Sequence, residues 1–387
     1  MRHSLALALL FVASILSSPV LAQQAAPRLF ETKAAQVLMI EASTGTVLLA
    51  KGEDKPLPPA SLAKLMTLEV VFDAIRRREI GLETVYKVSE HAWRTGGAPS
   101  RTATMFAALK SELRVEDLLK GIAVQMANDA CIILAEGLDG SEETFAARMN
   151  ARAKALGLAA SAFANPTGLP APGNRTTLRD MVTLARHLQA TYPDFYRLFA
   201  QPEFEWNKIL QRNRNPLIGR AAGVDGLASG FAEESGYALV ASAERNGRRL
   251  FLAISGLPSD KERTEEAVRL FDWAFGAFEM RHLFKPGQTI GAASVYGGDS
   301  GAVDLVAAGP VDVFVPIDDP ERLQARIVYR WPLRAPLAAG TEVGVLQLSS
   351  GERLLREVKL QSAAAVGEGT LRQKAGDALF ELLFFWL

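Results

Sequence analysis

Cysteine is almost absent from this 387-residue chain, and Cys131 is its single example. A lone cysteine cannot form an intrachain disulfide, and its place in an apolar helical run predicts an ordinary buried thiol. The 4 histidines are scattered without the spacing of a metal site, so we predict no zinc centre. Lysine plus arginine and aspartate plus glutamate each number 43. This balance gives no reason to expect a nucleic-acid partner.

The N-terminus has the features of a secretory signal peptide. Arg2 and His3 give a positive start, an apolar run extends from Leu5 to Leu16, and small residues occupy the cleavage-defining positions before Gln23. The same pattern could be an uncleaved anchor helix, but the run is short for one. We therefore predict that residues 1–22 are a signal peptide and that the mature protein is exported.

Apolar periodicity divides the next part of the chain into strand-rich and helix-rich regions. Two β-type runs flank Ser43-Thr44-Gly45 and predict a hairpin, after which Pro58-Pro59 precedes a helix that begins near Ser61. Residues 115–198 show the three- and four-residue spacing of helices, and Asn246-Gly247 marks a second hairpin. Strands on both sides of a helical middle predict one sheet assembled from distant segments, with helices packed on it.

The C-terminal part has a different composition. From about residue 282 to 362, alternating apolar residues with frequent glycine and proline predict a small all-β domain, and residues 362–370 are typical of a linker. Residues 371–387 have the pattern of an amphipathic helix that is too short to span a bilayer. Its apolar face contains Leu371, Ala375, Ala378, Leu379, Leu382 and Leu383, and its polar face contains Arg372, Lys374, Asp377 and Glu381. We expect it to lie in a membrane interface; docking on the protein's own core is the alternative.

The stretch from Pro59 to Thr67, PASLAKLMT, carries the clearest chemistry. Residues three apart share a helical face, so the hydroxyl of Ser61 and the amine of Lys64 can meet near the helix start. A serine needs a base to become a nucleophile, and a lysine whose pKa is lowered by burial can supply one. The N–H groups of a helix start favour the anionic oxygen of an acyl-transfer intermediate. Taken alone, a serine and a lysine three residues apart could equally be a helix cap and a surface lysine. The surrounding sequence is needed to choose between this interpretation and a catalytic pair.

That context resembles the serine D-alanyl-D-alanine carboxypeptidases, the low-molecular-mass penicillin-binding proteins, whose first motif is Ser-x-x-Lys. The similarity covers nearly the whole mature chain in order. Its segments are the Ser43-Thr44-Gly45 hairpin, PASLAKLMT, SEHAWRTGG, VEDLLKGIAVQMANDAC, NPTGLPAPG, VDGLASGFAEESGYALVASA, the β domain and the amphipathic tail.

The resemblance implies a domain organisation. Residues 27–281 would form an α/β catalytic domain of the transpeptidase and β-lactamase type, in which an antiparallel sheet is flanked by helices and joined by a helical subdomain. Residues 282–362 would form an all-β sandwich, and residues 371–387 an anchor helix on the periplasmic face of the inner membrane. No metal or organic cofactor is implied.

By the same resemblance, Ser61 is the nucleophile that forms an acyl-enzyme and Lys64 is its general base. The family's Ser-x-Asn motif falls on Met126-Ala127-Asn128, which keeps the asparagine but replaces the serine by a thioether that cannot relay a proton. The Lys-Thr-Gly motif falls on Ala228-Ser229-Gly230, which lacks the lysine that would receive the substrate's terminal carboxylate. Arg249 either replaces that charge or is a solvated strand-end residue, depending on the pairing register.

The leading hypothesis is a carboxypeptidase that removes the terminal D-Ala from peptidoglycan stem peptides ending in D-Ala-D-Ala, with β-lactams as covalent inhibitors. The alternative is a catalytically impaired peptidoglycan-binding or regulatory relative, which the two altered motifs favour and the retained Ser61, Lys64 and Asn128 oppose. A β-lactamase would need a deacylating base, for which Glu233 and Glu234 lie in the right general stretch.

Overall fold

The computed structural model describes residues 30–318 and 323–384. The predicted signal peptide, residues 1–22, lies outside the described residues, as do the last three residues of the predicted tail helix.

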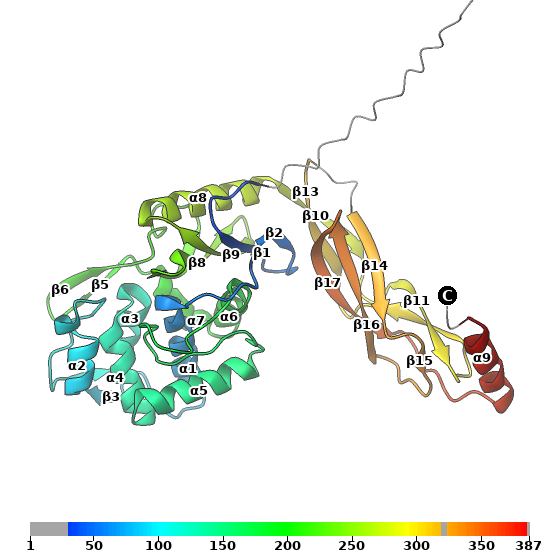
Figure 1. The fold of residues 1–387 in the computed structure, drawn as a ribbon, viewed down its shortest axis with the longest axis horizontal. Helices are drawn as coiled ribbons and strands as arrows, with labels where there is room; N and C mark the ends of the chain where they lie inside the picture. The colour runs from blue at the N-terminus through cyan, green and yellow to red at the C-terminus, as the bar shows by residue number, and fades with distance from the viewer. Residues whose placement is uncertain (1–29, 319–322, 385–387) are drawn as a thin grey trace, which may run out of the picture. The chain divides into compact units, whose positions relative to one another are not determined.

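A five-stranded antiparallel sheet forms the frame of the catalytic region (Figure 1). Its strands, in spatial order, are β2 (Val47–Lys51), β1 (Gln36–Glu41), β9 (Arg248–Leu257), β8 (Gly236–Arg245) and β7 (Val224–Ala232). The first hairpin therefore pairs with strands that follow much later in the sequence, which confirms the prediction of one sheet built from distant segments. Asn246 and Gly247 both have positive φ values, 51° and 75°, as the tight turn between β8 and β9 requires.

Helices and short hairpins fill the sequence between β2 and β7. They are η1 (Ala60–Ala63), α1 (Lys64–Arg76), β3 (Val85–Lys87), α2 (Glu90–Thr95), η2 (Ala98–Ser100), β4 (Glu112–Arg114), α3 (Val115–Gln125), α4 (Asn128–Asp139), α5 (Glu142–Ala155), α6 (Leu178–Thr191), α7 (Pro193–Tyr196), η3 (Arg197–Ala200), β5 (Glu203–Trp206) and β6 (Ile209–Arg212). The last helix of this region, α8 (Asp260–Gly276), packs on β8 and β9.

Helix α1 is the centre of the catalytic region. Of its 13 residues, 11 are buried, and a helix covered on all sides belongs to a core rather than to a surface. Its side chains join one hydrophobic core with residues of α3, α4, α6 and the sheet. The predicted helix near Ser61 begins as the short 3-10 turn η1, which runs directly into α1.

A separate all-β region follows α8, with a hydrophobic core of its own that includes Val295, Leu305, Val313 and Leu346. Strand β10 (Phe278–Phe284) pairs with β13 (Val311–Pro316). A six-stranded sheet has the order β14 (Leu323–Tyr329), β16 (Glu342–Ser350), β17 (Arg353–Ser362), β12 (Ala302–Val306), β11 (Thr289–Tyr296) and β15 (Leu333–Arg334). The predicted all-β character is confirmed. The expected starting residue, 282, falls inside β10.

The predicted linker at residues 362–370 connects β17 to α9 and packs against the β domain. The backbone of Val366 pairs with that of Leu337 through hydrogen bonds of 2.8 and 2.9 Å, and only 3% of Val366 is exposed. Gly369 donates its N–H to the carbonyl oxygen of Gly297 at 2.9 Å. Small residues suit a flexible linker, but they also allow two backbones to approach closely, and composition does not separate these cases.

The predicted tail helix is present as α9 (Leu371–Phe384). No helix within residues 30–318 and 323–384 is long and apolar enough to cross a bilayer.

Candidate active site

Ser61 and Lys64 meet where η1 passes into α1. The side-chain nitrogen of Lys64 donates to the hydroxyl of Ser61 at 3.1 Å and to the carbonyl oxygen of Thr167 at 2.5 Å. One turn of helix separates the two residues, so the helical backbone itself fixes their approach. The first N–H groups of a helix have no helical acceptor, and the N–H of Ser61 therefore points out of the helix start. The pair has the geometry of a nucleophile with its base.

Lys64 lies in the protein interior, with 1% of the residue exposed. Burial disfavours the charged ammonium form and lowers the pKa of Lys64 to about 8. The lone cysteine is close enough to Lys64 to interact with it electrostatically, and burial raises the pKa of the Cys131 thiol to about 12. The thiol is therefore protonated and unreactive near neutral pH, whereas a useful fraction of Lys64 is a free amine that can accept a proton.

The loop of Asn165 to Leu169 forms one wall of this site, a role that its sequence did not reveal. The side-chain oxygen of Asn165 accepts hydrogen bonds from the backbone N–H groups of Thr167 and Gly168, which orients the Thr167 carbonyl toward Lys64. Gly168 has a φ of 76°, and a Cβ there would lie 1.7 Å from the carbonyl oxygen of Ala60. Only glycine fits this approach. The signal available in the sequence was the Asn-Pro-Thr-Gly turn, which by itself predicts no more than a turn.

The second motif stands at the junction of α3 and α4. Asn128 is the first residue of α4, and its side-chain NH2 donates to the hydroxyl of Thr102 at 2.9 Å. Its side-chain oxygen is buried and has no hydrogen-bond partner among the described residues. A buried acceptor without a partner is costly and suits a ligand N–H. Met126 is 4% exposed, occupies the left-handed region with a φ of 57° and belongs to the hydrophobic core of the catalytic region.

The third motif lies on β7, which pairs only with β8 and has no strand on its outer side within the described residues. A Cβ on Gly230 would lie 3.3 Å from the backbone nitrogen of Ser61, so this strand borders the nucleophile. Ser229 donates its hydroxyl to the carbonyl oxygen of Arg214 at 3.0 Å. Ala228 is fully buried and offers no charge. The structure thus places Gly230 against the backbone of Ser61, with Ser229 next to it on the same strand.

Arg249 lies at the other end of the strands. Its guanidinium forms ion pairs with Asp225 at 2.8 Å and Glu244 at 2.6 Å. Strand β8 pairs its residue 239 with Ser229 and with residue 254 of β9, which is five residues from Arg249. At about 3.3 Å per residue the separation along the strand is roughly 16 Å. The structure does not bring Arg249 to Ser229, and two carboxylates already neutralise it.

Arg214 is an exposed arginine whose backbone contacts the third motif, and the motif pattern in the sequence did not identify it. It is exposed, its carbonyl is held by Ser229, and its Nε donates to the side chain of Gln125 at 3.3 Å. Gln125 directly precedes Met126, so this arginine stands between the two altered motifs. No local sequence pattern marks it, because only the folded chain places it beside β7.

Glu233 and Glu234 occupy the exposed turn between β7 and β8. No hydrogen bond or ion pair within the described residues connects either carboxylate with Ser61 or Lys64. The geometry therefore gives no support to a deacylating base at these positions.

Residues 21–258 match the family of D-alanyl-D-alanine carboxypeptidases, and residues 278–368 match the C-terminal domain of penicillin-binding protein 5. The chain is 35% identical over 352 residues to the D-alanyl-D-alanine carboxypeptidase DacC of Escherichia coli, covering 90% of this chain and 88% of the relative. The structure of penicillin-binding protein 5 from Haemophilus influenzae superposes with a TM-score of 0.73 at 31% identity, over 87% of this chain and 98% of that one.

A further solved structure matches about two thirds of the chain. Penicillin-binding protein D2 of Listeria monocytogenes in its cefotaxime-bound form gives a TM-score of 0.58 at 27% identity, and the match covers 65% of this chain and 100% of that chain. The chain is a member of the serine D-alanyl-D-alanine carboxypeptidase family, an enzyme of the penicillin-binding class that acts on peptidoglycan.

Proposed function

We propose that Ser61 carries out the carboxypeptidase reaction on stem peptides that end in D-Ala-D-Ala. The observation that carries this assignment is the 3.1 Å contact between the Ser61 hydroxyl and a buried lysine whose pKa is lowered to about 8. Lys64 accepts the hydroxyl proton as the oxygen of Ser61 attacks the carbonyl carbon of the penultimate D-Ala. The negative charge that forms on the carbonyl oxygen is stabilised by the N–H of Ser61 at the helix start.

The acyl-enzyme forms when the C–N bond breaks and the terminal D-Ala leaves. Its amine needs a proton, and Lys64 holds the one taken from Ser61. In the absence of a motif serine at position 126, Lys64 itself or a water returns this proton, a longer route that slows the step. Water then attacks the ester, releases the shortened peptide and restores the Ser61 hydroxyl.

Two further groups position the substrate. The unpaired side-chain oxygen of Asn128 accepts an N–H of the bound peptide, which removes the cost of its burial. The terminal carboxylate is received by Ser229 and by Arg214, an exposed residue whose carbonyl oxygen accepts the Ser229 hydroxyl. A charge-assisted hydrogen bond of this kind contributes about 1.5 to 3 kcal/mol.

β-Lactams acylate the same serine, because their amide carbonyl occupies the position of the D-Ala-D-Ala carbonyl. The cefotaxime-bound relative supports this assignment. For location, we propose export through the signal sequence at residues 1–22 and attachment to the periplasmic face of the inner membrane through α9. The amphipathic pattern of residues 371–387 supports the second part.

The test combines fluorescent-penicillin labelling with D-Ala release from a D-Ala-D-Ala pentapeptide, for the mature protein and Ser61→Ala. We expect label and release with the parent protein and neither with Ser61→Ala, while Ser43→Ala, outside the site, behaves like the parent. Release by Ser61→Ala at the parent rate would exclude Ser61 as the nucleophile. Labelling of the parent without release of D-Ala would favour the second candidate, a peptidoglycan-binding relative with impaired turnover. The presence of Met126 in place of a motif hydroxyl is the observation behind this candidate.

A further inference from the structure

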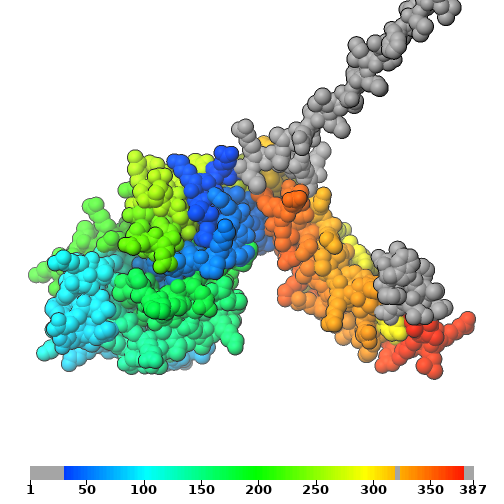
Figure 2. All heavy atoms as spheres, viewed as in Figure 1, coloured from blue at the N-terminus to red at the C-terminus, as the bar shows by residue number. Residues whose placement is uncertain are grey.

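Helix α9 docks on the β domain through its polar side. The carboxylate of Asp377 accepts the N–H of Gly297 at 2.8 Å, and the side-chain amide of Gln373 donates to the carbonyl oxygen of Asp299 at 3.2 Å. Lys374, one turn before Ala378, pairs with Glu368 at 2.9 Å. Figure 2 shows the start of α9, in red, beside the yellow and orange residues of this domain. The orientation of the helix about its own axis is thereby fixed.

This docking leaves the apolar side of the first two turns uncovered. Leu371 is 88% exposed, and Ala375 and Ala378 are exposed as well, whereas Lys374 and Asp377 are partly buried. A helix that docks on its own protein normally buries its apolar side. Here the polar side is used for docking, so the apolar side is left for a different partner.

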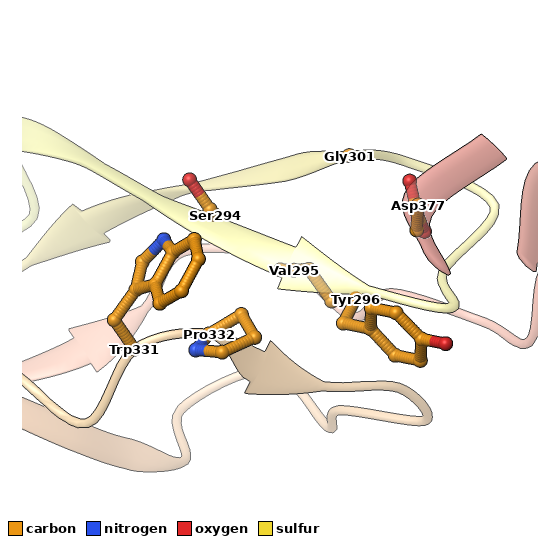
Figure 3. A pocket seen from close by; sticks show the side chains of 7 residues that line it. All are labelled: Ser294, Val295, Tyr296, Gly301, Trp331, Pro332 and Asp377. Atoms are coloured by element: carbon orange, nitrogen blue, oxygen red, sulfur yellow. The ribbon is translucent and has the colours of Figure 1, made fainter. Parts of the chain in front are cut away.

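A second uncovered apolar group lies next to α9. Trp331 is 50% exposed and lines a cavity of about 190 Å³ together with Tyr296, Pro332 and Asp377. In Figure 3 the rings of Trp331 and Tyr296 stand on either side of Pro332, and Asp377 reaches the same cavity from α9. The tryptophan and the helix are therefore neighbours at one end of the β domain.

Exposed arginines are close in the sequence to these apolar groups. Arg330 and Arg334 flank Trp331, and Arg372 lies in the first turn of α9; all three are exposed. Within the described part of the chain none of them pairs with a carboxylate, and Arg334 instead lies 5.9 Å above the ring of Tyr296. Tryptophan beside arginine, next to an apolar helix side, is the composition of a protein surface at a membrane interface.

We propose that Trp331, Arg330 and Arg334, called here the Trp331 surface, bind an anionic phospholipid bilayer together with the apolar side of α9. The inference rests on the proposed membrane attachment and adds a second contact to it. The indole inserts at the headgroup level while the arginines meet lipid phosphates. Because α9 is hydrogen-bonded to the β domain, two contacts instead of one hold this domain to the bilayer, and it binds in a defined orientation and not only through a tail.

A sugar of the peptidoglycan glycan strand is the other ligand that an exposed tryptophan could stack against. The cavity, at about 190 Å³, is smaller than the roughly 300 to 1,000 Å³ of an enclosing ligand site. The carboxylate that lines this cavity, that of Asp377, already accepts a hydrogen bond from a backbone N–H. Arginine can donate hydrogen bonds to a neutral sugar, but only an anionic ligand such as a lipid phosphate uses its charge, so the bilayer accounts for more of the surface.

The experiment measures sedimentation of the full mature chain with vesicles of phosphatidylcholine that contain a minor fraction of phosphatidylglycerol. Trp331→Ala removes the indole, and Leu354→Ala is its matched control. Leu354 is also exposed, at 43%. It pairs with Ser349 near the turn of the β16–β17 hairpin, whereas Trp331 follows the end of β14 that pairs with Gly344, at the opposite end of β16. We expect Trp331→Ala to partition roughly fivefold to tenfold more weakly and Leu354→Ala to match the parent. For the double variant Arg330→Gln/Arg334→Gln, we expect the affinity for anionic vesicles to fall roughly fivefold per arginine and the affinity for neutral vesicles to change little.

A second measurement reports contact directly. In a Trp386→Phe background, brominated lipids quench tryptophan emission, and the quenched fraction disappears when Trp331→Phe is added. Parent-like partitioning of Trp331→Ala together with no quenching of Trp331 would overturn the inference while leaving attachment through α9 intact. Loss of binding only on deleting residues 371–387 would likewise overturn it and confine the membrane contact to α9. Failure of the parent to bind vesicles would overturn both proposals. Sedimentation of the 371–387 deletion with purified peptidoglycan, lost in Trp331→Ala, would assign the surface to glycan instead.

Discussion

The side-chain nitrogen of Lys64 lies 3.1 Å from the hydroxyl oxygen of Ser61, and 1% of that lysine is exposed. In the proposed reaction, proximity gives the serine a base, and burial gives that base a pKa at which it can act. Neither property suffices alone, because an exposed lysine near its usual pKa is charged at neutral pH and cannot accept a proton.

Acylation by a β-lactam should therefore become faster as pH rises through about 8. Burial lowers the pKa of Lys64 to about 8, and only the neutral amine accepts the Ser61 proton. The neutral fraction is about one in a hundred at pH 6, about one in ten at pH 7 and about half at pH 8. Stopped-flow labelling with a fluorescent penicillin between pH 6 and 9 measures this profile. A rate that stays flat over that range would show that Lys64 is not the base.

The thioether of Met126 should limit the rate of proton return to the leaving amine. Met126→Ser restores a hydroxyl at a buried position beside Asn128, and we expect D-Ala release to rise by about tenfold or more. Met126→Ala is the matched control, because it removes the same bulk without adding a hydroxyl. Equal rates for the serine and alanine variants would mean that another group already carries the proton. Both variants are expected to melt earlier, since each leaves a cavity.

Arg214 should contribute to substrate binding, whereas Arg249 should contribute to the stability of the fold. Arg214→Gln removes the charge of an exposed residue whose backbone contacts Ser229, and we expect kcat/KM for a D-Ala-D-Ala peptide to fall by roughly ten- to a hundredfold with little change in Tm. Arg249→Gln leaves Asp225 and Glu244 without their cation and is expected to lower Tm with little effect on kcat/KM. Steady-state kinetics and thermal melting of both variants decide the matter. The opposite pattern would restore Arg249 as the carboxylate-binding residue.

Gly168→Ala should disable the site by moving its wall. The added Cβ would lie 1.7 Å from the carbonyl oxygen of Ala60, so the backbone must shift, at a cost of about 3 kcal/mol or more. Gly173→Ala is a control on the same loop, with a φ of 89° and no heavy atom within 4 Å. It should cost about 1 kcal/mol from conformation alone and leave penicillin labelling intact. Labelling of Gly168→Ala at the parent rate would show that this wall does not position Lys64.

The sequence predicted those parts of the molecule whose signals are local. Strand alternation, the Asn246-Gly247 turn and the apolar α1 follow from periodicity and turn chemistry, and the fold that they indicated is present. The Ser61 and Lys64 pair was predictable because both residues belong to one helical turn. The likeness to a family then gave positions 128 and 229 their places in the site.

Contacts between residues far apart in the sequence could not be predicted from local sequence patterns. The choice between Arg249 and Arg214 depends on pairing register and on where a loop crosses β7, and neither is encoded within a few residues. The Thr167 carbonyl is a backbone group, which every residue type has, so the sequence could not indicate its contact with Lys64. The segment of small residues at 362–370 could have been a linker or a closely packed backbone, and only its pairing with residue 337 distinguishes the two.

Strand β7 ends the sheet with an outer edge that no other strand covers within the described residues. A peptide bound there would add a strand and be read through its main chain, which is the same for every amino acid. Side chains upstream of the scissile bond would contribute little to recognition along this edge. One enzyme could then process stem peptides of varied composition, and its selectivity would reside in the two residues that flank the bond it breaks.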